Sequence, residues 1–193
     1  MKKIFCLTTA TLTLFGCDQS TTSSNNIDRQ KYEESKTNTV IDSKVNQTHK
    51  SIHPSNLFTL SDAEKILGEP AHLTDSSSTI EGNTSIYRCA YTANSKDQKT
   101  GKTGVIYFLF EQYVQVSSAQ KKYSFIKKAN ENNGIKELHD MGDEAYFHSD
   151  GQNFYFIMVR KDENVYNMKV NKITPTTSLD EFNLIAKKIT AAL

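Results

Sequence analysis

The sequence predicts an α+β fold, arranged as a single α/β/α sandwich of three helices and a mainly antiparallel sheet of about six strands. Three observations indicate this. Helical patterns alternate with two groups of strand patterns, with three strands in each group. Most neighbouring strands are joined by turns too short for a crossover connection, so they pair antiparallel. Two strand patterns are apolar on both sides and therefore need cover on both faces of the sheet.

The first half of this domain begins with a short helix. Ser61 and Glu64, three residues apart, are typical of a capping box, and Gly68 suits the left-handed residue that ends a helix. The predicted bounds are 60–68 for the helix, 71–80 for a polar edge strand, 85–92 for the next strand and 104–110 for an unbroken apolar strand in the middle of the sheet.

The second half repeats the order, with a helix, three strands and a last helix. The predicted bounds are 117–132 for the helix, 145–149, 152–160 and 165–171 for the strands, and 178 for the start of the last helix. Asp150-Gly151 is a two-residue hairpin signal, and Ser178 with Glu181 forms a second capping box. The strand at 152–160 is apolar on both sides, so we expect it beside the central strand. We place Phe108, Phe156 and Ile185 in the core.

The N-terminus has the form of a signal peptide at residues 1–16. Two lysines precede an apolar-to-neutral run that is too short for a spanning helix, which needs about 20 apolar residues. The stretch Leu14-Phe15-Gly16-Cys17 resembles the lipobox of bacterial lipoproteins, although Phe15 departs from the small or β-branched residue usual there. The resemblance implies that Cys17 receives lipid and becomes the first residue of the mature protein. The alternative is a secreted protein whose Cys17 follows the cleavage site by chance.

The residues after Cys17 predict where the domain is held. In enteric-type Gram-negative lipoproteins, an aspartate at the position of Asp18 resembles a signal for retention in the inner membrane. We therefore expect attachment to the inner membrane, facing the periplasm, with the outer membrane as the alternative. Residues 17–54 are rich in polar residues and predict a disordered tether, with a root-mean-square span of about 35 Å. The globular domain is predicted at 55–193.

Charge and cysteine content narrow the range of partners. The chain has 23 Lys and Arg residues against 22 Asp and Glu residues, so it has no basic footprint for nucleic acid. Of the three cysteines, Cys6 leaves with the signal peptide and Cys17 is expected to carry lipid. Cys89 then has no disulfide partner in the mature chain. Its place in an apolar strand pattern predicts a buried, inert thiol.

Three short motifs carry a resemblance that covers most of the domain. They are Leu60-Ser-Asp-Ala-Glu-Lys-Ile-Leu-Gly-Glu-Pro70, Arg88-Cys-Ala-Tyr91 and Met141-Gly-Asp-Glu-Ala-Tyr-Phe147. Together they look like the pattern of small bacterial lipoproteins similar to the PsbP-like α/β/α sandwich group. The resemblance implies the same fold and a protein that binds partners more often than it catalyses. No site residue is carried over.

Catalytic motifs are absent from the sequence, and one polar cluster is a candidate for a metal site. It contains His139, Asp140, Asp143, Glu144 and His148, whose imidazole and carboxylate groups are possible ligands of a divalent metal. Their spacing matches no ligand template, and the alternative is a connecting loop with solvated acids. Neither a cofactor nor a catalytic residue is therefore assigned. Lys121, Lys122, Lys127 and Lys128 are interpreted as a solvated helix face, with membrane-surface contact as the alternative.

Two functions follow as hypotheses. The first is a membrane-anchored envelope lipoprotein, not an enzyme, whose domain binds another envelope protein or a cell-wall component. The second is a sensor or enzyme that binds a metal or small ligand through the cluster from His139 to His148. The sequence indicates neither the partner nor the oligomeric state.

Overall fold

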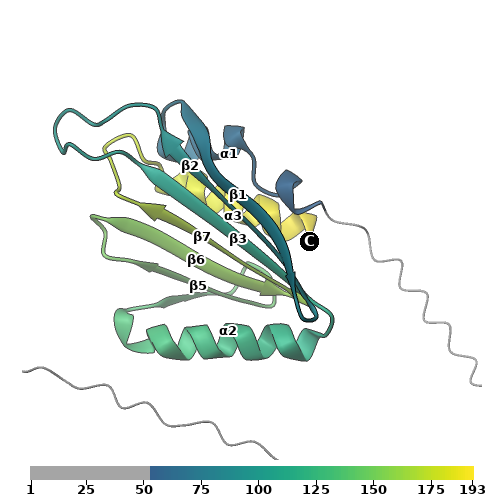
Figure 1. Cartoon of the computed structure of the whole chain (residues 1–193). Helices are drawn as coiled ribbons and strands as arrows, with labels where there is room; N and C mark the ends of the chain where they lie inside the picture. The colour runs from purple at the N-terminus through teal and green to yellow at the C-terminus, as the bar shows by residue number, and fades with distance from the viewer. Residues whose placement is uncertain (1–52) are drawn as a thin grey trace, which may run out of the picture. The chain divides into compact units, whose positions relative to one another are not determined.

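A computed structural model gives the structure of the chain, and it describes residues 53–193 (Figure 1). The predicted signal peptide, Cys17, Asp18 and all but the last two residues of the predicted tether lie outside the described residues. The described part belongs to one compact unit that ends at Leu193. Its fold is α+β, with one antiparallel sheet and three α-helices.

The sheet has seven strands, and the prediction of about six missed one. Its order is β1-β2-β3-β7-β6-β5-β4, and every neighbouring pair is antiparallel. The bounds are β1 Ala71–Glu81, β2 Thr84–Ala93, β3 Val105–Tyr113, β4 Lys136–Leu138, β5 Glu144–Ser149, β6 Phe154–Lys161 and β7 Asn164–Asn171. The missed strand is β4, whose three residues are too few to show a period. The predicted edge position of β1 is confirmed.

Pairing at the centre of the sheet differs from the prediction. The strand beside β3 is β7, with Phe108 opposite Met168, and β6 lies one position farther out. β6 forms hairpins with β7 on one edge and with β5 on the other, so neither edge of β6 is free to pair with β3. Apolarity on both sides identified an inner strand correctly, but it did not identify its neighbour.

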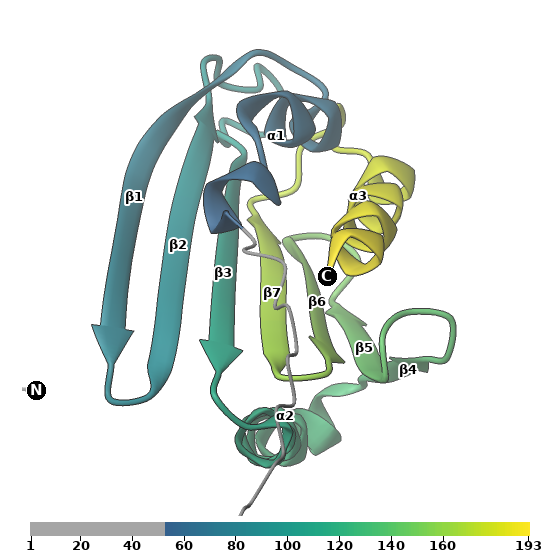
Figure 2. The same ribbon diagram turned by 90° about the vertical axis from the view of Figure 1, so that its right-hand side faces the viewer.

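The helices lie on both faces of the sheet (Figures 1 and 2). Their bounds are α1 Leu60–Leu67, α2 Val116–Asn130 and α3 Leu179–Ala192, with short 3-10 turns at Pro54–Asn56 and Glu131–Asn133. One face carries α1 over β1 to β3 and α3 against β6. The other face carries α2, which contacts β6, β7 and β3. None of the helices in residues 53–193 has the length and apolarity that a bilayer-spanning helix requires.

Each face has its own buried cluster of side chains. The larger cluster joins α1 and α3 to the sheet through residues that include Phe58, Phe108, Phe110, Tyr166, Phe182 and Ile189. The smaller one joins α2 to Tyr146, Met158 and Val165 through Ala119 and Tyr123. Phe108 and Ile185 are buried as predicted, whereas Phe156 is only partly buried because it lies at the margin of the smaller cluster.

Polar contacts tie α3 to the rest of the domain. The hydroxyl of Tyr166 on β7 donates to the carbonyl oxygen of Ala186 and lies 2.7 Å from Oγ1 of Thr190. Lys188 donates to both carboxylate oxygens of Asp62 in α1 at 2.7 Å. The Tyr166 contacts hold α3 against the sheet, and the contact between Lys188 and Asp62, which are 126 residues apart, fixes how α1 and α3 lie on their shared face.

Two local predictions need correction. The capping box of α1 uses Thr59 and Asp62, not Ser61 and Glu64; Asp62 Oδ2 accepts the backbone N–H of Thr59 at 3.0 Å. The N-cap is therefore two residues earlier than predicted, and the helix begins at Leu60. The β5–β6 connection has four residues, not two, because Asp150 Oδ1 accepts backbone N–H groups from Gln152, Asn153 and Phe154 and closes a wider loop.

The second cap is confirmed in position. Ser178 precedes α3, and its Oγ accepts the backbone N–H of Glu181 at 3.2 Å. Gly68 ends α1 with a left-handed φ of 71°, as predicted. Cys89 is buried, and Tyr87 and Tyr91 share its face of β2.

Candidate binding face

The structure divides the acids of the polar cluster weighed as a metal site among separate cationic partners. Asp143 and Glu144 both accept hydrogen bonds from the guanidinium of Arg160, at 2.7 and 2.6 Å. Asp140 pairs instead with Lys187 of α3 at 2.6 Å. These three carboxylates therefore hold β5, β6 and α3 in place, and a metal would have to displace two cations to reach them.

The two histidines of the cluster belong to different surroundings. His148 is on β5, where its Nδ1 is buried without a hydrogen-bond partner and its ring lies 4.9 Å from that of Phe154. His139 follows β4 and lines a shallow hollow with Tyr123 and Lys127. Within residues 53–193, no three or more His, Cys, Asp or Glu side chains gather closely enough to hold a metal ion. No observation in this part of the chain favours the second hypothesis.

The predicted solvated lysine face of α2 is partly engaged. Lys122 lies 3.2 Å from Glu111 of β3, and Lys127 lies 2.5 Å from Glu137. Lys121 is exposed. The pair between Lys122 and the buried Glu111 fastens α2 to the sheet at the edge of its contact area.

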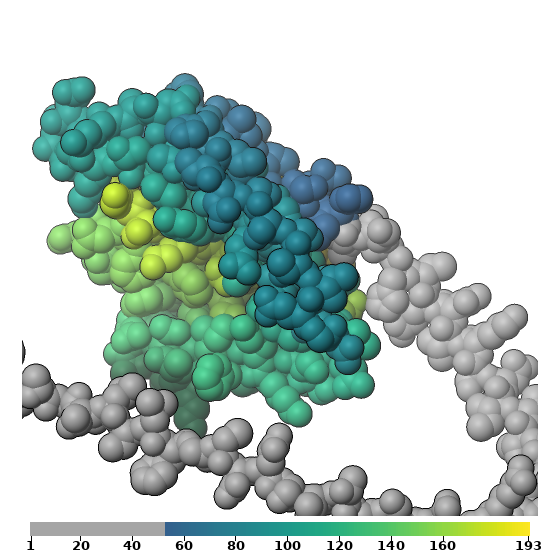
Figure 3. All heavy atoms as spheres, viewed as in Figure 1, coloured from purple at the N-terminus to yellow at the C-terminus, as the bar shows by residue number. Residues whose placement is uncertain are grey.

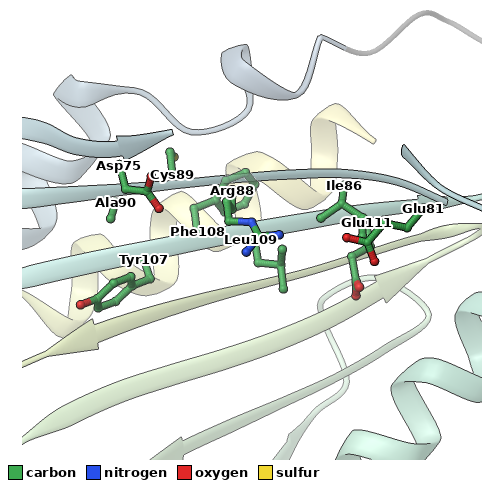
Figure 4. Close-up of a pocket in the computed structure, with 10 residues that line it drawn as sticks. All are labelled: Asp75, Glu81, Ile86, Arg88, Cys89, Ala90, Tyr107, Phe108, Leu109 and Glu111. Carbon is green, nitrogen blue, oxygen red and sulfur yellow. The ribbon is translucent and has the colours of Figure 1, made fainter. Parts of the chain in front are cut away.

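Beyond that pair, one part of the sheet has no helix of residues 53–193 over it. We call this surface the open face: the side of β1, β2 and β3 that carries Asp75, Glu81, Ile86, Arg88, Tyr107 and Leu109. In an antiparallel pair, residues opposite each other share a face. The pairs Asp75 with Ala90, Arg88 with Leu109, and Ala90 with Tyr107 therefore place these side chains on one side of the sheet. Figure 4 shows them together across the three strands.

The open face is a shallow hollow of about 310 Å³. Its walls combine apolar and charged groups: Tyr107 is 45% exposed, Ile86 and Leu109 are half-buried, and Arg88 is exposed. In Figure 3, atoms of the sheet are exposed between α2 and the body of the β1–β2 hairpin, and the two approach each other at the hairpin's tip. Apolar side chains on an uncovered sheet face are typical of an interaction surface.

The charges of the open face are not neutralised within the domain. Neither Asp75 nor Glu81 forms an ion pair with any residue in 53–193, and the same holds for Arg88. Glu111, by contrast, is buried and paired with Lys122. Burial, together with the adjacent Glu111 carboxylate, raises the pKa of Tyr113 well above its ordinary value. At the margin nearest α2 the charged groups are therefore paired, whereas the carboxylates of Asp75 and Glu81 and the guanidinium of Arg88 face solvent.

The thiol of Cys89 does not reach the open face. Its side chain is buried among the larger cluster on the opposite side of β2. Burial raises the pKa of this thiol, and contacts with Tyr87 and Tyr91 oppose the shift without reversing it. A protonated, enclosed thiol is a poor nucleophile, so this cysteine is part of the packing.

Sequence reasoning missed the open face, because the apolar run of β3 predicted cover on both sides. One contrary signal was present: Arg88 interrupts the apolar pattern of β2 on the side opposite Cys89. A charged side chain on that side of an inner strand indicates a face that solvent reaches.

A scan of the chain against protein-family models gives no match, and a search of curated proteins finds no significantly similar sequence. The open face and its chemistry are therefore the basis for proposing a function.

Proposed function

We propose that this protein is an envelope lipoprotein, anchored in a bacterial membrane by lipid on Cys17, whose domain binds an envelope protein without catalysis. The stretch Leu14–Cys17 supports the anchor, since it resembles a lipobox. Asp18 supports retention in the inner membrane, with the domain in the periplasm. The polar residues that follow, up to about residue 54, supply the length of chain needed to reach a partner away from the headgroups.

The single observation that supports binding is the open face. A half-exposed tyrosine, two half-buried aliphatic residues and an unpaired arginine lie together on it. Aromatic residues and arginine are enriched where proteins bind one another. The hollow lies at the lower end of the range for small-molecule sites, about 300 to 1,000 Å³, and it is open along the strands. A protein surface fits it better than an enclosed small ligand.

We further propose that the domain is an α/β/α sandwich related to the PsbP-like lipoproteins that its three short motifs resemble. Helices on both faces of one antiparallel sheet support this arrangement. The incomplete cover on the α2 side is the feature that a binding role would use.

The anchor is tested by labelled palmitate and by membrane fractionation. We expect Cys17→Ser to abolish incorporation of label and lipoprotein-type cleavage. Wild type should sediment with the inner membrane, and Asp18→Ser should shift it toward the outer membrane. Continued labelling of Cys17→Ser would contradict the anchor, and wild type in the outer-membrane fraction would contradict retention by Asp18.

Binding is tested by placing a photo-crosslinking residue at Tyr107 in the full chain and irradiating cells. The matched control carries it at Leu184, which is exposed on α3. We expect a discrete protein adduct from position 107 alone, and its loss when Arg88→Glu is added. Equal adducts from both positions, or adducts that muramidase digests, would contradict a protein partner on the open face; the latter would indicate a cell-wall component.

A further inference from the structure

The two edges of the sheet are protected very differently (Figure 2). At one edge, β4 has only three residues and carries Lys136. Short strands and lysines are the usual means of preventing strands of other molecules from pairing with an edge. At the other edge, β1 has eleven residues, and nine of them are exposed. It is long and contains no lysine, so this edge lacks both of those safeguards, and it contains no proline either.

Part of the β1 edge is regular enough to act as a template. The register with β2 shifts between Leu73 and Asp75 and is then unbroken from Asp75 to Glu81. At about 3.3 Å per residue, these seven residues present about 23 Å of edge. Alternate residues of an edge strand direct their N–H and C=O groups outward, where a further strand can pair with them.

The side chains along this edge specify the chemistry of such a strand. On the open face, Asp75 and Glu81 stand at the two ends of the regular segment without ion-pair partners in the described part of the chain (Figure 4). On the opposite side, Ile80 is 78% exposed and the serines beside it are small. A paired strand places its side chains beside these in alternation. It would therefore meet carboxylates on one side and uncovered aliphatic surface on the other.

The same charges disfavour a second copy of this chain. Two β1 strands that pair antiparallel over all seven residues have their symmetry axis at Ser78, and Asp75 of each copy then lies opposite Glu81 of the other. Like charges directly opposite each other destabilise a strand pair. Basic side chains at those two positions would instead complete each pair.

We propose that β1 accepts a strand from the partner protein by strand addition, and that this strand carries Lys or Arg opposite Asp75 and Glu81. The same added strand carries aliphatic residues opposite Ser76, Ser78 and Ile80. The inference rests on the proposed binding function and specifies the partner. The added strand extends the sheet beyond β1, so the partner also borders the open face.

The test uses the full chain in detergent micelles and a fluorescent peptide, Arg-Val-Thr-Val-Thr-Val-Arg, in which the arginines are spaced to meet Asp75 and Glu81. The control peptide, Val-Arg-Thr-Val-Thr-Arg-Val, has the same composition with the arginines moved to the other side of the strand. We expect fluorescence anisotropy to show at least tenfold tighter binding of the first peptide. Hydrogen exchange of alternate amides within residues 75–81 should slow at least tenfold when it binds.

The double variant Asp75→Lys, Glu81→Lys provides the charge reversal, and both positions are exposed, so the fold should tolerate it. It should bind the basic peptide at least tenfold more weakly and prefer a peptide ending in glutamates. Equal binding of the two basic peptides would overturn the proposal, as would amide protection without peptide accompanied by a dimer in sedimentation. If the adduct at Tyr107 persists but no peptide binds, strand addition is wrong and the binding function stands; if the adduct is also absent, both are wrong.

Discussion

Gly68, at the end of α1, packs against the segment before α3, and adding one methyl group there should destabilise the domain sharply. A Cβ at this position would lie 2.1 Å from the carbonyl oxygen of Thr176, a backbone atom that cannot rotate away. Two hydrogen bonds flank the contact. Thr176 Oγ1 donates to the carbonyl oxygen of Leu67 at 2.9 Å, and the backbone N–H of Ser178 donates to the carbonyl oxygen of Ile66 at 2.8 Å. Gly68→Ala must therefore separate α1 from this segment.

The expected loss has two parts, and a matched control separates them. A non-glycine residue in the left-handed region costs about 1 to 2 kcal/mol. Gly82 has a similar φ of 57° with nothing within 4 Å of its Cβ position, so Gly82→Ala should lose only that amount. Gly68→Ala adds an overpacking cost of about 1 to 3 kcal/mol and weakens hydrogen bonds that contribute about 1 kcal/mol each. We expect a total loss of about 3 to 5 kcal/mol.

Urea denaturation followed by circular dichroism measures both variants in the full chain. The difference between Gly68→Ala and Gly82→Ala is the informative quantity, because the strain of the left-handed backbone is common to both. Losses that agree within about 0.5 kcal/mol would mean that Gly68 does not contact Thr176, and the placement of α1 against the segment before α3 would be wrong.

Three further outcomes follow from the packing. Phe108→Ala should cost about 3 to 5 kcal/mol in the same assay, and Phe156→Ala should cost clearly less because Phe156 is only partly buried; equal losses would contradict the margin position of Phe156. Cys89 should react with a thiol reagent only as fast as the domain unfolds, since burial encloses it and raises its pKa; rapid native labelling would mean that its side of β2 is open. Burial alone would raise the pKa of Asp62, but hydrogen bonds from Lys188 and Thr59 outweigh it and hold the pKa below its ordinary value of 3.8. The ionised Asp62 carboxylate therefore stabilises the folded domain above about pH 4, and this stabilisation is lost as pH falls through the lowered pKa. Asp62→Asn should make the free energy of unfolding depend less on pH in the acid range. An unchanged pH dependence would contradict the pairing with Lys188.

The sequence alone determined those features that depend on neighbours along the chain. Gly68 and Ser178 mark helix ends because capping uses residues within one turn. The strand with Tyr87, Cys89 and Tyr91 on one face follows from alternation, which a strand imposes wherever it lies. The resemblance of Leu14–Cys17 to a lipobox is likewise local, and it remains a prediction about residues that the structure does not describe.

Only the tertiary structure decided which strands meet and which surfaces stay uncovered. Whether β6 or β7 pairs with β3 depends on how two hairpins assemble, and the apolar pattern of β6 is compatible with either strand order. The exposure of Tyr107 depends on where α2 lies on the sheet, and Lys122 and Glu111, close in sequence but on different elements, help to fix that position. The acids from Asp140 to Glu144 were weighed as a metal site, but Asp140 pairs with Lys187 of α3, 47 residues away, and Asp143 and Glu144 pair with Arg160 on the neighbouring strand. The first pair depends on how α3 packs and the second on the register of β5 with β6, so neither follows from the spacing of the acids.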